Sequence, residues 1–296
     1  MLDLQDEDSF EKGKSGMLLS KLLCEKARKE FIKRCIAFDT PRLESEQYPE
    51  DVRVEADLVY DGGHALDLYI PPAVKDEKAA YLLIHGGAFV YGTKELDKCF
   101  GMHLAKASGI AVANMDYTLM PDTGLKGQIG EIFAAIRFLQ KEKNIEKIHT
   151  IGDSAGGYLA LLSGILLGSE KARDEFFLPK ADYPACESSR LICCAFLATP
   201  KSLGGCYFDT EKELQPYIYD LTKAIEQYSC PPLTLITGDK DTLLKQNREL
   251  KKRLESLDVP FTYKEFQSAE DRVMHHVFCI AHPDWPEGAE AIKMCL

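Results

Sequence analysis

The sequence contains no long hydrophobic run. Its most apolar stretch, residues 158–167, is about half of the ~20 residues that a membrane-spanning helix needs. Residues 1–8 carry acidic side chains in place of the positive charge and apolar run of a secretory signal. These absences predict a cytoplasmic protein with no stable membrane association.

Basic residues are in the minority. The chain has 36 Lys and Arg against 47 Asp and Glu, which gives a formal net charge of −11 at pH 7. An acidic surface repels phosphate groups, so we expect no nucleic-acid partner and no docking on an anionic membrane. The composition leaves a homo-oligomer open.

Metal-binding and redox signatures are missing as well. The sequence has 10 cysteines but no C-x-x-C pair, which is the usual pattern of zinc knuckles and thioredoxin-type sites. No two histidines have helical ligand spacing with an acid between them. We therefore expect no metal and no cofactor. Because disulfides are rare in the cytoplasm, we expect the cysteines to be reduced.

What the sequence does contain is a regular alternation of short apolar runs and helical stretches. Residues 54–60 and 65–70 flank a turn at Asp61-Gly62-Gly63 and predict an antiparallel hairpin. Strands are then expected at 79–84, 110–115, 148–151, 191–197, 233–237 and 261–266, and helices at 94–108, 126–141, 155–167, 243–257 and 288–295. This order is typical of an α/β fold with a mostly parallel sheet and helices on both faces. We expect a single domain over residues 1–296.

Two segments fall outside this order. Residues 10–37 have helical apolar spacing that should end before Pro41, and residues from about 199 to about 230 exceed what a strand connection needs. We expect cap segments over the active site at about 1–45 and about 199–230. The apolar stripe of the first should be used up in docking on the core. The aromatic residues of the second, at 207, 208, 217 and 219, should line a modest pocket.

A serine lies where one predicted strand meets the next helix, in Gly152-Asp153-Ser154-Ala155-Gly156-Gly157. A strand–serine–helix turn projects the hydroxyl above the sheet, which suits a nucleophile. Side chains at Gly152 and Gly156 would clash where the strand and the helix approach each other. The pattern lacks the lysine of a nucleotide-binding loop, which disfavours a phosphate site.

A second motif, His85-Gly86-Gly87-Ala88-Phe89, follows the strand expected at 79–84. Acyl transfer builds negative charge on the former carbonyl oxygen, and backbone N–H groups can stabilise it. Glycines allow the backbone to approach the substrate closely. We expect Gly86, Gly87 and Ala155 to form this oxyanion hole, and His85 to have a structural role.

A nucleophilic serine needs a base, and the base needs an orienting acid. On such a fold the acid and then the histidine follow the serine along the chain. The histidines in that part of the sequence are His275, His276 and His282, and the candidate acids after a strand are Asp239 and Asp241. The order alone leaves the choice among them open.

Together these motifs resemble the hormone-sensitive-lipase-like esterases of the α/β-hydrolase fold. The resemblance rests on residues 85–89, 152–157, 241–243 and 276–278, in that order. It implies an α/β-hydrolase fold with a helical cap and a triad of Ser154, Asp241 and His276. Ala88 stands where the family usually has a third glycine, and Thr118 where it usually has an arginine.

The activity that this resemblance implies is that of a serine esterase. Such an enzyme hydrolyses small carboxylic esters through an acyl-enzyme intermediate, and we expect short acyl groups to be preferred. An amidase or peptidase of the same fold, similar to the aryl-formamidases, is the alternative. A catalytically inactive small-molecule-binding protein is a further one, which the presence of His276 disfavours.

Overall fold

The centre of the molecule is an eight-stranded sheet with the order β1-β2-β4-β3-β5-β6-β7-β8. The structure, a computed structural model, describes residues 5–209 and 211–296, with side chains from residue 22 onward. The strands are β1 (Arg53–Asp61), β2 (His64–Ile70), β3 (Ala79–Ile84), β4 (Ala111–Met115), β5 (Lys147–Asp153), β6 (Ala185–Ile192), β7 (Leu233–Gly238) and β8 (Phe261–Phe266). β2 pairs antiparallel with β1 and β4, and all other pairs are parallel. The predicted hairpin and mostly parallel sheet are confirmed.

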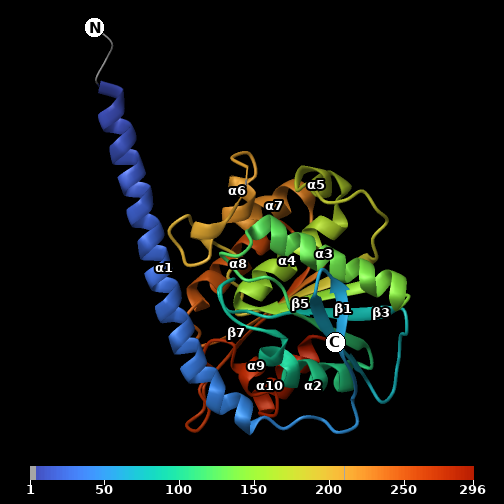
Figure 1. Ribbon diagram of the computed structural model, residues 1–296. Coiled ribbons are helices and arrows are strands. Elements are labelled where there is room, and N and C mark those ends of the chain that lie inside the picture. The colour runs from blue at the N-terminus through green and yellow to red at the C-terminus, as the bar shows by residue number, and fades with distance from the viewer. Residues whose placement is uncertain (1–4, 210) are drawn as a thin grey trace.

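Helices cover both faces of the sheet, as predicted (Figure 1). One face carries α2 (Lys98–Ser108), which follows the 3-10 turn η1 (Lys94–Asp97), together with α9 (Phe278–Ala281) and α10 (Pro286–Met294). The other carries α3 (Leu125–Glu142), α4 (Ser154–Gly168), α5 (Glu170–Glu175), α7 (Leu221–Tyr228) and α8 (Leu244–Ser256). Side chains of β3 alternate between two apolar clusters, with Leu82 and Ile84 in one and Tyr81 and Leu83 in the other. This alternation is what a strand buried on both faces requires.

The strand expected at 191–197 begins and ends earlier than its apolar pattern suggests. β6 ends at Ile192, and Cys193 has a left-handed backbone with φ 48°. The Cys193 N–H still donates to the Ile236 carbonyl of β7 at 2.8 Å, but the backbone of the next residue binds a side chain. The buried Asn247 accepts from the Cys194 N–H at 3.2 Å and donates to the Cys194 carbonyl at 3.3 Å. A tertiary partner therefore replaces the strand pairing that the local pattern predicted.

The N-terminal segment is one helix, α1 (Gln5–Ser45), whose N-terminal part extends beyond the body of the protein (Figure 1). It continues through Pro41, against expectation. Arg42 stabilises this last turn through ion pairs with Asp39 and Glu46 at 3.1 and 2.7 Å. The expected docking of its apolar stripe holds for Phe31, which packs against the core, and is wrong for Leu22, Leu23 and Ile36, which are exposed. Within residues 5–209 and 211–296, no helix is long and apolar enough to cross a membrane.

The segment from 199 to 230 contains the 3-10 turn η2 (Gly205–Tyr207), α6 (Gln215–Tyr219) and α7. It is joined to α1 by a disulfide between Cys24 and Cys206. The expectation that all cysteines are reduced is therefore wrong for this pair, which lies 182 residues apart in sequence and could not be inferred from spacing. The other eight cysteines are free, and five of them are buried: Cys99, Cys193, Cys194, Cys279 and Cys295.

Candidate active site

The turn between β5 and α4 places Ser154 in a strained backbone. Its φ is 50°, in the left-handed region that side chains rarely adopt. Close backbone packing holds the turn. A Cβ on Gly156 would lie 1.9 Å from the Ile84 carbonyl oxygen, and one on Gly152 would lie 2.5 Å from the Gly156 carbonyl carbon. The predicted clash at both glycines is therefore confirmed.

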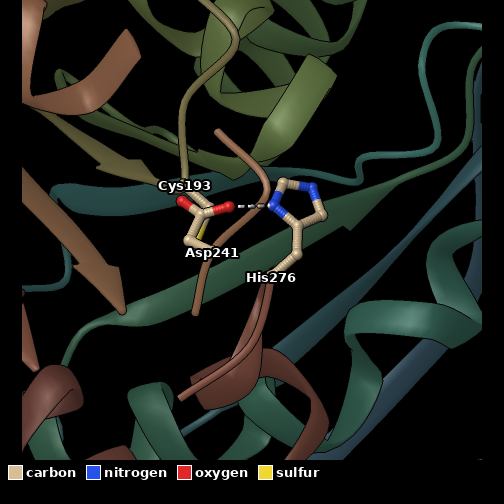
Figure 2. A group of neighbouring side chains, drawn as sticks. All are labelled: Cys193, Asp241 and His276. Carbon is tan, nitrogen blue, oxygen red and sulfur yellow. Dashed lines mark hydrogen bonds and ion pairs between the residues drawn. The ribbon is translucent and has the colours of Figure 1, made fainter. Parts of the chain in front are cut away.

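A histidine and an aspartate from two other loops meet this serine. His276, after β8, has Nε2 2.9 Å from the Ser154 Oγ. Its Nδ1 lies 2.6 Å from the Asp241 Oδ1, in the loop after β7 (Figure 2). With Nδ1 protonated toward the carboxylate, Nε2 is free to accept the serine proton. The three residues form a continuous hydrogen-bonded chain that ends at the hydroxyl.

The Asp241 carboxylate is fixed by more than the histidine. Thr237 donates to Oδ2 at 2.6 Å, and the Leu243 N–H donates to Oδ1 at 2.8 Å. Burial alone would raise the pKa of Asp241, but these hydrogen bonds and His276 hold it below its usual value. The group is therefore an anion that keeps the imidazole oriented.

Cys193 lies next to the same carboxylate (Figure 2). Its Sγ accepts a hydrogen bond from the Val277 N–H at 3.3 Å, next to the histidine. One ligand-type atom each from Cys193, Asp241 and His276 lies within 4.8 Å of the others, which is compact enough to hold a metal ion. Burial raises the pKa of the Cys193 thiol well above its usual value, whereas a metal ligand must be a thiolate. The imidazole and the carboxylate already satisfy each other, so the set fits a proton-relay site better than a metal site.

The cavity that Ser154 lines is also lined by the three residues expected to donate to an oxyanion hole, Gly86, Gly87 and Ala155. Gly87 has φ 95°, and a Cβ there would lie 2.0 Å from the Tyr91 carbonyl oxygen. Ala88 has φ 52°, which explains why a third glycine would be easier at this position. The loop is thus held in a strained conformation, with positive φ angles at Gly87, Ala88 and Phe89.

His85 is buried beneath this loop, as expected for a structural residue. Its Nδ1 lies 2.9 Å from the Gly86 carbonyl oxygen, and its ring stacks on Tyr117 with centroids 4.3 Å apart. The Tyr117 hydroxyl donates to the His85 carbonyl at 2.9 Å. Burial lowers the pKa of His85 to about 4, so the ring is neutral at physiological pH.

A pair of buried carboxyl groups behind the elbow escaped sequence analysis. Asp153 and Asp97 are 6% and 1% exposed and hydrogen-bond each other. Burial raises the pKa of both groups, so the pair retains a proton where separate carboxyls would be ionised. The Gly86 backbone also hydrogen-bonds the Asp153 carboxyl, which ties the pair to the oxyanion loop. The charge of Arg42 lowers the pKa of Asp97 and that of Asp39 raises it. The charge of His276 lowers the pKa of Asp153.

The competing sequence candidates occupy other places. The His275 Nδ1 lies 2.7 Å from the His276 carbonyl oxygen, and its ring meets Phe38 edge to face. Asp239 accepts from the Ser268 hydroxyl at 2.5 Å and pairs with Lys240 at 3.3 Å. Within the described part of the chain, neither side chain hydrogen-bonds the Ser154 hydroxyl or the His276 imidazole.

These groups open into one cavity of about 680 Å³, within the ~300–1,000 Å³ of ordinary small-ligand sites. Both expected cap segments contribute to its wall, α1 through Phe31 and Phe38 and the second segment through Ser202 and Leu203. The expected aromatic lining is wrong, because the described residues of this wall include none of Tyr207, Phe208, Tyr217 and Tyr219. Phe208 instead packs against aromatic rings of the core and of its own segment: Phe89, Tyr158 and Tyr219.

Comparison with known proteins identifies the family. Residues 81–279 match the family Abhydrolase_3, described as alpha/beta hydrolase fold. The chain belongs to this family. The match runs from β3 to α9 and includes the elbow, the oxyanion loop and both loops that meet the serine. The predicted fold and the hormone-sensitive-lipase-like family are confirmed.

Individual relatives are similar over most of the chain. An acetyl-hydrolase of Streptomyces hygroscopicus is 24% identical over 254 residues, which cover 78% of each protein. An acetyl esterase of Salmonella dublin is 27% identical over 229 residues, 71% of this chain and 69% of the relative. A crystal structure of esterase B from Lactobacillus rhamnosis with a tributyrin phosphonate inhibitor has a TM-score of 0.81, 27% identity and 92% coverage of both chains. The predicted enzyme class, a carboxylic ester hydrolase, is confirmed.

Proposed function

We propose that Ser154, His276 and Asp241 are the catalytic triad of this ester hydrolase. The observation that carries the proposal is the unbroken chain from carboxylate to imidazole to hydroxyl, at 2.6 and 2.9 Å, which ends inside the cavity. A serine hydroxyl with a base at hydrogen-bond distance, and a carboxylate behind that base, is the arrangement that nucleophilic acyl transfer needs.

The proposed reaction follows from this geometry. The Ser154 Oγ attacks the ester carbonyl carbon while its proton passes to the His276 Nε2. Negative charge on the former carbonyl oxygen is stabilised by the N–H groups of Gly86, Gly87 and Ala155. The imidazolium, held by Asp241, then protonates the leaving alcohol. Water then attacks the acyl carbon while His276 takes its proton, and the same proton returns to the Ser154 oxygen as the carboxylic acid leaves.

We further propose that residues from about 1 to 45 and about 199 to 230 are caps of one α/β-hydrolase domain, and that short acyl esters are preferred. Both segments contribute side chains to the cavity wall. Ala88, which stands where the family usually has a glycine, lines the same cavity as Ser154. Acetyl esterases among the relatives agree with a small acyl group. A rate that climbs steadily as the acyl chain passes about eight carbons would contradict this preference.

Ser154→Ala tests the proposal directly. Because members of a triad act as a unit, removing the nucleophile should reduce hydrolysis of an aryl acetate by on the order of 10⁴-fold or more. The variant should unfold at the same temperature as the wild type. Retention of most activity would contradict the assignment of the nucleophile.

An amidase or peptidase of the same fold remains the second candidate, since an oxyanion loop and triad serve both reactions. The rates on an aryl ester and on the matched anilide separate the two. A ratio that strongly favours the ester supports the proposal, and a comparable or faster rate on the anilide would replace it.

We also propose a cytoplasmic location without stable membrane association. The net charge of −11 and the eight free cysteines support it. Disulfides are rare in the cytosol, so this location predicts that thiol labelling in intact cells finds Cys24 and Cys206 reduced, and an intact disulfide there would oppose it. Fractionation of cells that express the chain should place it in the soluble fraction, and recovery with membranes would contradict the proposal.

A further inference from the structure

The cavity wall has an uneven distribution of charge. Six of its described side chains are acidic or basic: Arg34, Asp39, Arg42, Asp97, Asp153 and Lys240. Those deep in the wall are matched among themselves. Arg42 pairs with Asp39 at 3.1 Å and is buried, and Asp97 and Asp153 share a hydrogen bond behind the elbow. All four side chains are buried or partly buried.

The two remaining charges are both positive and lie at the exposed edge of the cavity. Arg34 of α1 is exposed and has no hydrogen-bond or ion-pair partner within residues 22–209 and 211–296. Glu30, one helical turn away, makes no ion pair with it in that range. The side chain of Lys240 is 62% exposed, and its only ion pair in the same range is with the adjacent Asp239.

Arg34 lines the cavity next to Cys35. Its positive charge opposes the rise that burial causes in the pKa of the Cys35 thiol, which also lines the cavity. The chain has a net charge of −11, yet both of the exposed charged side chains that line the cavity are positive. Guanidinium groups bind carboxylates through paired charge-assisted hydrogen bonds.

We propose that this cavity selects esters whose far end carries a carboxylate, bound at the rim by Arg34 with support from Lys240. This inference rests on the proposed ester hydrolysis at Ser154 and adds the class of substrate. The carboxylate belongs either to the acyl half, as in a monoester of a dicarboxylic acid, or to the alcohol half, as in an acylated hydroxy acid. In both, the apolar middle of the substrate lies along the largely apolar wall.

Two matched pairs of substrates test the selection and separate the two halves. Mono-4-nitrophenyl adipate against 4-nitrophenyl hexanoate places the charge on the acyl side. 4-Acetoxybenzoate against 4-acetoxybenzamide places it on the alcohol side. In at least one pair, kcat/KM for the anionic ester should exceed that for the neutral ester about five- to tenfold. The difference should lie chiefly in KM, because an ion pair at the edge of a cavity contributes more binding free energy than one fully exposed to water.

Variants of α1 identify the cation responsible. Arg34→Gln should bring the anionic-to-neutral ratio close to one, and Arg34→Lys should restore part of it. Lys33→Gln is the matched control, because it removes the same charge from the neighbouring residue, which does not line the cavity. Raising the salt concentration should lower the ratio in the wild type and leave it unchanged in Arg34→Gln.

Absence of a preference in both pairs, or a preference that Arg34→Gln leaves intact, would overturn the inference. Failure of the proposed function looks different, because wild type and Ser154→Ala would then hydrolyse the neutral esters equally. Thermal unfolding of each variant checks that the fold is kept, which is expected for an exposed residue without partners.

Discussion

The nucleophile elbow and the N-terminal helix are held in place by different kinds of contact. The elbow is enclosed by backbone, because Gly156 lies so close to the Ile84 carbonyl that a Cβ would clash. α1 is attached through a few side chains along its length. They include the Cys24–Cys206 disulfide, the Tyr207–Glu25 hydrogen bond at 3.3 Å, the Phe38–His275 ring contact and the bond from Arg42 to the Leu96 carbonyl at 3.1 Å.

This difference separates chemistry from substrate choice. The reacting side chains lie in the turns and loops that follow strands, where backbone packing can hold a residue within a fraction of an ångström of its position. The cavity wall from α1 depends on side-chain contacts and can change with little effect on the fold. Substitutions near the strand ends should therefore abolish turnover, whereas substitutions that release α1 should change which substrate binds.

The largest effect should come from His276→Ala, which removes the base. Hydrolysis of an aryl acetate should fall on the order of 10⁴-fold or more. His275→Ala is the matched control, because its ring contacts Phe38 and not the serine. Steady-state kinetics of both variants check the assignment, and an inactive His275 variant beside an active His276 variant would reverse it.

Asp241→Asn should have the next largest effect. The amide keeps the shape but can stabilise the wrong tautomer of His276, at a cost of up to about 10⁴-fold in kcat. Asp239→Asn should lower kcat far less, because that carboxylate binds Ser268 and Lys240 instead. Comparison of kcat for the two variants decides the point, and a severe loss confined to Asp239→Asn contradicts it.

Release of α1 should have a smaller effect and a different character. Cys24→Ser, or reduction of the wild type by dithiothreitol, should shift KM for longer aryl esters a few-fold, with kcat for the acetate nearly unchanged. Cys230→Ser removes a free cysteine that does not line the cavity and serves as the control. Equal KM values before and after reduction would show that the disulfide does not hold the cavity wall.

The smallest predicted effect concerns stability and pH. Burial raises the pKa of Asp97 and Asp153 in the folded state. The folded protein therefore binds a proton more tightly than the unfolded chain does. Below the pKa of the unfolded chain these two carboxyl groups do not lower the free energy of unfolding. As the pH rises from there to the raised pKa of the folded state, they lower it progressively. Asp97→Asn should therefore gain stability relative to wild type between pH 4 and pH 8, on the order of 1 kcal/mol. Urea midpoints at the two pH values measure this, and an unchanged difference would contradict it.

The sequence predicted the ends of the strands more accurately than the structure of the caps, for a physical reason. β3 and β8 have the predicted bounds, and Ser154 and His276 meet as the resemblance implied, because both depend on patterns local to one strand and its loop. The Asp97–Asp153 contact joins residues 56 positions apart, and no local pattern records it. The exposure of Leu22 and Leu23 and the passage of α1 through Pro41 likewise depend on what the helix lies against.

Covalent labelling at the nucleophile tests the central claim most directly. A fluorophosphonate reacts with a serine only where a base and an oxyanion hole activate it, and peptide mass spectrometry locates the label. The account predicts one label per chain, on the peptide that contains Ser154, and none in Ser154→Ala. Labelling of another residue, or equal labelling of the alanine variant, would contradict the assignment of the active site.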